Sequence, residues 1–438
     1  MKKKLSIKKI FTTSLLSTLA LSNIEFVNAS NNPFLYEIKY SNSVIKDDPL
    51  PFDQIGFLDV KNITLLGVIN VSDPTALGIL ILNSSPTFEN SAVVFDSIVG
   101  IMNFNSISTF NHEVIVRGTT DKGINNFNGS SIMFNGPLTV EKNSGFGILN
   151  FDKSEMVFNA PVIINYNNVG MQTNNGSNTL FNDLVTVTNN TDSGVQIGGT
   201  MTFNKDLYLG NNMVGMYIYN DSIATINGNI TATENKDGDI IIYPANLIFN
   251  NDIIVDADIK GAFANAGNIT FNDGPTIKKI IGNKSFPVAN VTFAAKDFKK
   301  TAYLNNDIYA GGIELGELII GVDADTMLTG ITEIITNTTV FDLTKDLTLN
   351  GPLIDGTSLG INLTGAGRLI ITGNNALNTA IKATSNGNGN LVFTGGPTIN
   401  QPLGASGVNL ASVTFSAGAG NTATLHKNIN ANKVTFGG

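Results

Sequence analysis

The chain has 438 residues, no Cys, no Trp and a formal net charge of −9. The absence of Cys excludes disulfides, zinc–thiolate centres and thiol nucleophiles. Only two Arg occur, Arg117 and Arg368, and no basic stripe of the kind that binds nucleic acid is visible. Charged residues make up 14% and hydrophobic residues 42%, which favours a packed repeat protein over a disordered chain.

The segment 1–29 has the pattern of a secretory signal peptide. Lys2, Lys3, Lys4, Lys8 and Lys9 precede an apolar stretch from Ile10 to Leu21, and Val27 and Ala29 provide small or medium side chains before a cleavage point. The apolar stretch is short for a membrane anchor and is diluted with Ser and Thr. We therefore predict export, with cleavage after Ala29 and no membrane-spanning helix in the rest of the chain.

The segment 30–61 lacks the repeat that follows and carries the run Asp47-Asp48-Pro49-Leu50-Pro51. A segment of this kind would cover the open edge of the first repeat. The predicted organisation is therefore a signal peptide (1–29), an N-terminal cap (30–61) and a repeat region (62–438).

From position 62 onward a short pattern recurs, in which an aliphatic residue, Thr or a similar residue, Phe and Asn follow one another, as in Ile269-Thr270-Phe271-Asn272. The Phe positions recur at a nearly constant interval, with Leu66 expected one repeat earlier and Ile226 in one Phe slot: Phe88, Phe110, Phe134, Phe158, Phe181, Phe203, Phe249, Phe271 and Phe293. Residues i and i+2 of a strand share a face, so each repeat directs an apolar pair inward that only a stacked neighbour can bury.

A repeat of about 22 residues accommodates three short strands and three turns, which predicts an all-β fold, a right-handed parallel β-helix (β-solenoid) of about 16 rungs. The sequence lacks the leucine pattern of leucine-rich repeats, and its repeat is shorter than the blade of a β-propeller. It also shows no helical periodicity, which excludes helical repeats. Segments such as Asn135-Gly136-Pro137, Asp273-Gly274-Pro275, Asn350-Gly351-Pro352 and Gly395-Gly396-Pro397 are predicted to form equivalent turns with positive φ at Asn or Gly. Asn side chains at matching turns are expected to form amide ladders.

After about position 300 the repeat becomes looser and Gly becomes more frequent. Leu315, Phe341 and Ile371 are expected to continue the Phe series less regularly. The series then resumes at Phe393, Phe415 and Phe436.

The segments 389–398 (GNLVFTGGPT) and 428–438 (NINANKVTFGG), together with the signal peptide and the lack of Cys, resemble the passenger regions of autotransporters. The resemblance is strongest to the rickettsial surface cell antigens, best over 340–438 and diffuse over 60–340. It implies a passenger on the bacterial surface that acts in adhesion to or entry into host cells. A host-cell surface protein or glycan would be its partner.

The same resemblance implies an outer-membrane translocator barrel, but the chain shows no alternating strands of that kind. The sequence also stops directly after a repeat anchor, at Phe436-Gly437-Gly438. We therefore expect a truncated or split autotransporter. It would lie at the cell surface or outer membrane if another chain supplies the barrel, and would otherwise be periplasmic or secreted.

Motifs that suggest catalysis are incomplete. The segment 356–360 matches G-x-S-x-G, but no helix pattern follows Ser358, so a Gly-rich turn is predicted. His112-Glu113 begins like H-E-x-x-H, but Val116 occupies the second His position. The only other His is His426, so a three-His metal site is excluded, and both His are expected to be exposed turn residues.

Acidic and basic residues form a few local groups. The pairs Asp237/Asp239, Asp256/Asp258 and Asp323/Asp325 have the i, i+2 spacing that places both carboxylates on one strand face, which suits calcium or paired-carboxylate chemistry. We interpret them as solvated outer-face residues. One local basic patch, interpreted as a solvated face, comprises Lys278, Lys279, Lys284, Lys296, Lys299 and Lys300.

These observations predict a structural or adhesive protein rather than an enzyme, with no catalytic, cofactor-binding or metal-binding residue and no nucleic-acid partner. The alternative is a secreted β-helical carbohydrate-active enzyme, a lyase or hydrolase, since parallel β-helices carry such activities. That alternative requires a cleft in which carboxylates and a base converge.

Overall fold

The computed structural model describes the segments 54–59, 63–65, 69–72, 77–335, 339–356, 360–416, 418 and 420–437, with four short strands before them. These are β1 (Glu25–Asn28), β2 (Leu35–Lys39), β3 (Val44–Ile45) and β4 (Leu50–Phe52). Apart from β1, which pairs antiparallel with β2, the predicted signal peptide lies outside the described residues. In the described part of the chain no helix is long and apolar enough to cross a membrane.

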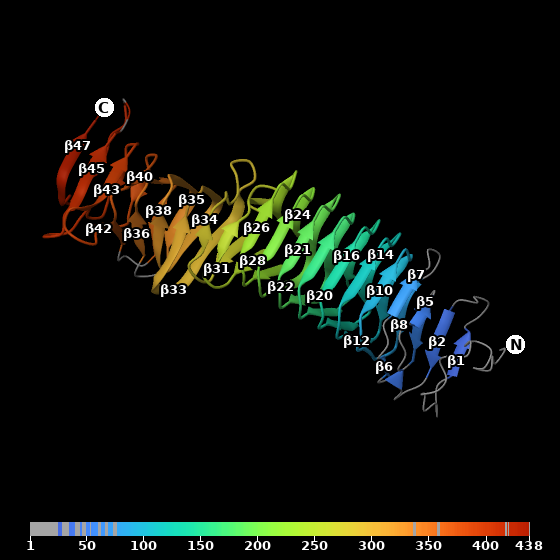
Figure 1. Cartoon of the computed structure of the whole chain (residues 1–438). Helices are drawn as coiled ribbons and strands as arrows, with labels where there is room; N and C mark the ends of the chain where they lie inside the picture. The colour runs from blue at the N-terminus through green and yellow to red at the C-terminus, as the bar shows by residue number, and fades with distance from the viewer. Residues whose placement is uncertain are drawn as a thin grey trace. The chain divides into compact units, whose positions relative to one another are not determined.

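The chain divides into two compact units, the first extending to about Tyr217 and the second comprising the chain from Gly238, with short stretches of both between Ile218 and Asp237. In each unit three strands follow one another in a rung, and each strand pairs in parallel with the strand at the same place in the next rung (Figure 1). We call the resulting stacks the first, second and third sheet. About 16 rungs of about 22 residues confirm the predicted parallel β-solenoid, while its right-handed sense stays a prediction.

The first unit contains three sheets. Two long strands, β20 (Val169–Phe181) and β22 (Ser193–Phe203), bend from the first sheet into the second. The other first-sheet strands are β5 (Gln54–Leu58), β8 (Leu77–Leu82), β11 (Val99–Phe104), β14 (Lys122–Phe127), β17 (Phe146–Asn150) and β24 (Val214–Ile218). The second-sheet strands are β6 (Ile63–Leu65), β9 (Pro86–Phe88), β12 (Ile107–Phe110), β15 (Ser131–Phe134), β18 (Glu155–Phe158) and β25 (Ile223–Ile226). The third-sheet strands are β7 (Ile69–Ser72), β10 (Ala92–Phe95), β13 (Val114–Arg117), β16 (Leu138–Glu141), β19 (Val162–Asn165), β21 (Val185–Thr188) and β23 (Leu207–Gly210).

The second unit repeats this plan with three strands that run through corners, β33 (Val288–Leu304), β34 (Ile308–Val322) and β35 (Thr326–Ile334). Its other first-sheet strands are β27 (Gly238–Ile242), β30 (Ile259–Gly261), β37 (Leu347–Asn350), β40 (Arg368–Ile371), β43 (Asn388–Phe393), β45 (Leu410–Phe415) and β47 (Ala431–Phe436). The second-sheet strands are β28 (Asn246–Phe249), β31 (Asn268–Phe271) and β38 (Leu353–Asp355), and at the same place in the last rungs β41 (Ala376–Leu377), β44 (Thr398–Ile399) and β46 (Thr424–Leu425) form a separate three-stranded sheet. The third-sheet strands are β26 (Ile230–Thr233), β29 (Ile254–Asp256), β32 (Thr276–Ile277), β36 (Val340–Leu343), β39 (Ile361–Thr364) and β42 (Ile381–Ala383).

The predicted Phe series forms the centre of the second sheet in the first unit. Phe134, Phe158 and Phe181 are fully buried, and the ring of Phe158 stacks at 5.2 Å on Phe134 and at 4.7 Å on Phe181. Each buried Phe contributes about 1.5–3 kcal/mol from burial, and each ring pair about 0.5–1.5 kcal/mol more. The spacing of the Phe residues therefore fixes the register of the rungs.

A second, polar ladder lies inside the first unit, at the corner between the third and first sheets. The Asn167 side-chain carbonyl accepts hydrogen bonds from both the backbone N–H and the amide of Asn143, at 3.1 and 2.7 Å, and Asn190 accepts from Asn167 in the same way. Left-handed residues such as Lys142 and Tyr166, with φ of 58° and 54°, precede these Asn and turn the chain inward. The ladder satisfies buried backbone donors that no strand reaches.

A column of small residues, among them Gly147 and Gly170, adjoins this ladder. A Cβ on Gly147 would lie 2.5 Å from the Gly170 carbonyl oxygen, so the rungs approach too closely for a side chain. Here the absence of a side chain, rather than backbone freedom, makes Gly necessary.

The Asn residues that follow most of these Phe form the amide ladder expected from the sequence. Asn135 donates to Asn111, Asn159 to Asn135 and Asn182 to Asn159, each at 2.7 Å. A further pair, in the second unit, is equivalent, since Asn272 donates to Asn250 at 2.7 Å.

Two details of the predicted ladder are wrong. Leu65, not Leu66, is in register with Phe88, and Leu66 itself lies outside the described residues. The late Phe series is on another sheet: Phe393 follows Ile371 in the first sheet, whereas Phe293 continues to Leu315 in the second.

The late Phe residues lie at another place in the rung. The interval between Leu315 and Phe393 is not a whole number of rungs of about 22 residues, so the two residues do not lie on the same sheet. Phe341 belongs to a third series, since it pairs with Ile320 and Leu363 in the third sheet.

The predicted equivalence of the Asn-Gly-Pro-type turns is also wrong. The turn at 135–137 connects second- and third-sheet strands, whereas those at 350–352 and 395–397 connect first- and second-sheet strands. Asn135 and Gly136 are not among the residues with positive φ. The residues of the first unit with a left-handed backbone conformation lie at the other two corners of the rung. There the chain turns from one sheet to the next around a buried polar side chain.

The segment predicted as a cap, 30–61, contains β2 and β5, which pair in parallel with each other. The predicted boundary at position 61 stays a prediction.

Candidate functional site

The three predicted acidic pairs differ in exposure. Asp237 is exposed while Asp239 is buried, so this pair does not share an outer face. Asp256 is half-buried and Asp258 exposed. The interpretation as solvated carboxylates is therefore wrong for Asp239, because a lysine from a later rung covers it.

That lysine is Lys279, which follows β32 and reaches back across two rungs. Its amine lies 3.2 Å from the Asp239 carboxylate and 4.0 Å from that of Asp256, and it donates to the Ala232 carbonyl at 2.6 Å. The Asp239 carboxylate also accepts from the backbone N–H of Asp258 at 3.0 Å. These contacts hold the carboxylates of Asp239 and Asp256 and the amine of Lys279 together across neighbouring rungs. The partners in all of these contacts are other groups of the chain.

Three of the six lysines of the predicted basic patch, Lys278, Lys279 and Lys300, pair with carboxylates. Lys300 lies 2.7 Å from Asp252 and 3.1 Å from Asp273, and hydrogen bonds to Asp252 and then Asp273 raise the pKa of Lys300. Lys278 lies 3.8 Å from Asp256. The side chain of Lys296 is outside the described residues.

The remaining predicted positions form no cluster in the described part of the chain. His112 and His426 are exposed turn residues, as expected, and Ser358 lies outside the described residues. Among the residues that the structure describes, no group of three His, Asp or Glu could hold a metal ion.

A pocket that sequence reasoning missed lies on the third-sheet side of the last rungs of the second unit. Its volume is about 410 Å³. Three consecutive rungs build it, because Ile381, Leu403 and Ile429 are bridged in parallel. The lining residues are Lys382, Pro402, Gly404, Ala405, Ser406, His426, Lys427, Asn428 and Asn430.

Gly404 is one of the residues that line this pocket. It stands between Lys382 and Asn430 in the stack, and its φ of +72° together with a Cβ position 2.0 Å from the Asn430 carbonyl oxygen excludes any side chain. Backbone hydrogen bonds hold it in place, since its N–H donates to Ile381 at 2.7 Å and Asn430 donates to Leu403 at 2.7 Å. Gly404 therefore lets the backbones of neighbouring rungs approach closely and contributes no side chain to the pocket.

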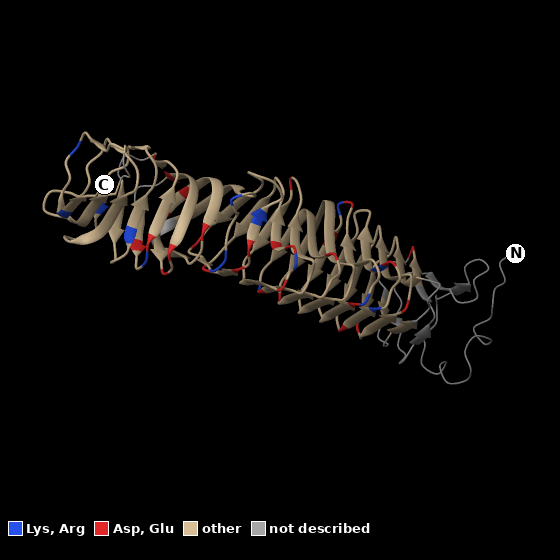
Figure 2. Ribbon diagram, turned by 90° about the horizontal axis from the view of Figure 1, so that it is seen from above, with Lys and Arg blue, Asp and Glu red and all other residues tan. Residues whose placement is uncertain are grey.

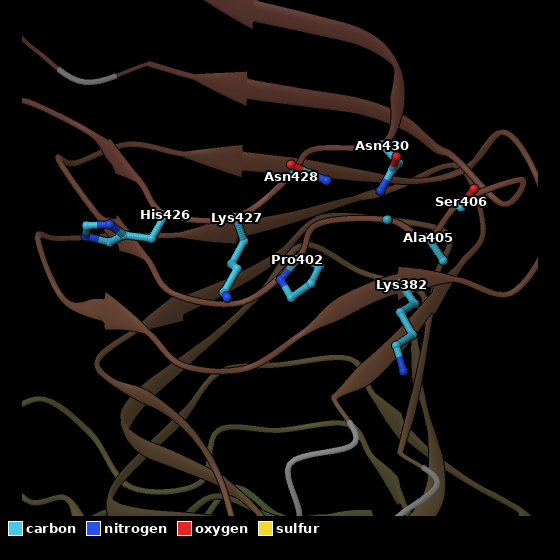
Figure 3. Close-up of a pocket in the computed structure, with 9 residues that line it drawn as sticks. Lys382, Pro402, Ala405, Ser406, His426, Lys427, Asn428 and Asn430 are labelled. Atoms are coloured by element: carbon cyan, nitrogen blue, oxygen red, sulfur yellow. The ribbon is translucent and has the colours of Figure 1, made fainter.

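Basic and neutral polar groups line this pocket. In Figure 3 the side chains of Lys382 and Lys427 run in the same direction on either side of Pro402, with Asn428 and Asn430 along the opposite edge and His426 at one end. Lys427, His426 and Asn428 are exposed and Lys382 is half-buried. The described lining of the pocket contains no carboxylate.

The charge of the surrounding sequence reinforces this character. All 35 Asp and Glu precede Gly356, whereas four of the 26 Lys and Arg follow it. Figure 2 shows the result within the second unit, where red segments are absent from the described turns next to the C-terminus. This asymmetry is visible in the sequence, and a charge count by segment would have indicated a cationic site there.

Comparisons of the chain with protein-family models, with curated protein sequences and with solved structures give no match. The resemblance to autotransporter passengers therefore rests on the sequence motifs and the fold class alone.

Proposed function

We propose that the protein is an exported structural and adhesive protein that acts where a bacterium meets a host cell. The observation that carries the proposal is the parallel β-solenoid itself. Its interior is filled by stacked apolar and amide side chains, so the exposed turns and outer strand faces are the parts that can bind another molecule. The signal-peptide pattern supports export to the cell surface or secretion.

Adhesion to cells is the test. Beads coated with the purified protein are added to cultured epithelial cells, and bound beads are counted after washing. We expect more bound beads than with an albumin coat, and we expect heat-unfolded protein to lose the difference. Equal numbers on albumin and protein beads would contradict the proposal.

The alternative, a carbohydrate-active enzyme, is favoured by one observation only, the grouping of Asp239, Asp256 and Lys279. Release of new reducing ends from acidic polysaccharides, lost in Asp256→Asn, would favour it over adhesion. Release that Asp256→Asn leaves unchanged would place the activity elsewhere.

A further inference from the structure

We propose that the pocket around Gly404 binds a sulfated saccharide. The inference rests on the proposed adhesive function, because it names the class of ligand that the adhesive surface would bind. It concerns Lys382 and Lys427 as the cationic groups, and Ser406, Asn428, Asn430 and the imidazole of His426 as the polar groups beside them.

The charge of the pocket favours an anion. Most of this protein is acidic, so an anionic ligand is repelled from the general surface and is attracted only where carboxylates are missing. The segment after Asp355 has no carboxylate side chain at all. Its only Arg, Arg368, is bound through Nε to both oxygens of Asp346, at 3.0 and 2.9 Å. The described lining of the pocket therefore contains the cations Lys382 and Lys427 and no carboxylate.

The cations of the pocket are of a kind that binds tetrahedral oxyanions. Lys acts as a point charge with three rotatable donors and binds such groups without the fixed two-pronged geometry of the Arg guanidinium. The described lining of this pocket contains Lys and no Arg. A sulfate group between Lys382 and Lys427 fits this chemistry.

The neutral residues favour a saccharide over a free ion. Asn amides and the Ser hydroxyl both donate and accept hydrogen bonds, as the hydroxyl groups of a sugar require. The volume of about 410 Å³ is in the lower part of the range for small-molecule sites. Lys382 and Asn430 are two rungs apart, about 10 Å at the usual strand spacing, which exceeds the span of one sulfate ion.

The test measures binding of a heparin-derived hexasaccharide to the purified protein by isothermal titration at low ionic strength. The same hexasaccharide with its sulfates removed, which retains its carboxylates, is the second ligand. We expect the sulfated form to bind and the desulfated form to bind at least about tenfold more weakly, since screened contacts to several sulfates are lost. Equal affinity for the two forms would overturn the inference.

Three variants locate the site. Each exposed Lys–anion contact is worth up to about fivefold in affinity, so we expect Lys427→Gln to bind about two- to fivefold more weakly and the double variant Lys382→Gln/Lys427→Gln about tenfold more weakly. Lys433→Gln is the matched control, because this exposed residue is on β47 in the first sheet, outside the pocket lining. Wild-type affinity in the double variant, or an equal loss in Lys433→Gln, would overturn the assignment to this pocket.

The outcomes separate this inference from the proposed function. Adhesion to cells without binding of the sulfated hexasaccharide leaves the adhesive function standing and refutes the ligand. Binding of the hexasaccharide without adhesion to sulfated-glycan-bearing cells refutes the adhesive function and leaves the ligand standing.

Discussion

The regular rungs between Leu77 and Tyr217 and the rungs after Asp355 share the same three-sheet plan but differ in how many of their polar side chains are buried. In the first region, Asn and Ser side chains point into corners and bond to the next rung, as Asn143 does to Asn167. In the second region, Lys427 and Asn428 are exposed at the pocket that Gly404 also lines. Regularity produces a scaffold, and a local departure from it produces a concave surface that a ligand can enter.

The largest effect is expected from the Phe ladder of the regular region. Phe158→Ala removes a fully buried ring between two stacked neighbours, and we expect a loss of about 3–5 kcal/mol in the free energy of unfolding, measured in urea. Val157→Ala, on the half-buried outer side of the same strand, is the control and should cost less than about 1 kcal/mol. Similar losses in both variants would show that the inner ladder is not the main source of stability.

The close packing of rungs gives the next effect. Gly147→Ala places a Cβ 2.5 Å from a backbone oxygen, and the required shift of a rung should cost about 3 kcal/mol. Gly418→Ala, in the other region, meets nothing within 4 Å and should leave the unfolding midpoint unchanged. An unfolding free energy of Gly147→Ala equal to that of the wild type would mean that the rungs can move apart at this position at little cost.

The two uses of Asn can be compared directly. Asn167→Ala leaves buried donors of Asn143 without a partner, which should cost about 2 kcal/mol, whereas Asn428→Ala at the pocket should be close to neutral. Urea unfolding of both variants checks the difference. If Asn428→Ala proves the more damaging, then the pocket is part of the scaffold.

The smallest effect concerns pH and the acid-free region. Hydrogen bonds from Arg368 hold the pKa of Asp346 below its ordinary value of 3.8. A lowered carboxyl pKa stabilises the fold above the unfolded-state pKa, and this contribution is lost as the pH falls through the lower folded-state pKa. Because the pair is substantially exposed, Asp346→Asn should cost less than about 1 kcal/mol at neutral pH.

Unfolding midpoints at pH 7 and at pH 2 check this expectation. The wild type and Asp346→Asn should differ at neutral pH and converge in acid. A difference that persists at pH 2 would assign the effect to packing rather than to charge.

The sequence was sufficient for the architecture wherever one chemical signal recurred at constant spacing. Phe88 to Phe293 predicted both the rung length and the inner face. The prediction failed after Leu315, because the Phe residues that resume at Phe393 lie on the first sheet and not on the second. Periodicity alone cannot tell which of three equivalent sheets an apolar residue belongs to.

Sites were harder to predict for a related reason. Asp239 looked like an exposed carboxylate, because its partner, Lys279, is distant in the chain and only stacking brings them together. The pocket includes Gly404, which lies between Lys382 and Asn430 in the stack of rungs, and the three residues are far apart in the sequence. Contacts between rungs are invisible to reasoning that considers one rung at a time.

The most direct test of the division between scaffold and binding site is adhesion of coated beads to epithelial cells by three proteins in parallel. These are the wild type, Lys382→Gln/Lys427→Gln, and Asn159→Ala, which alters the exposed amide ladder of the regular region. We predict that the double lysine variant loses most of its adhesion while Asn159→Ala adheres like the wild type. Full adhesion by the double lysine variant, or loss in Asn159→Ala, would contradict the account.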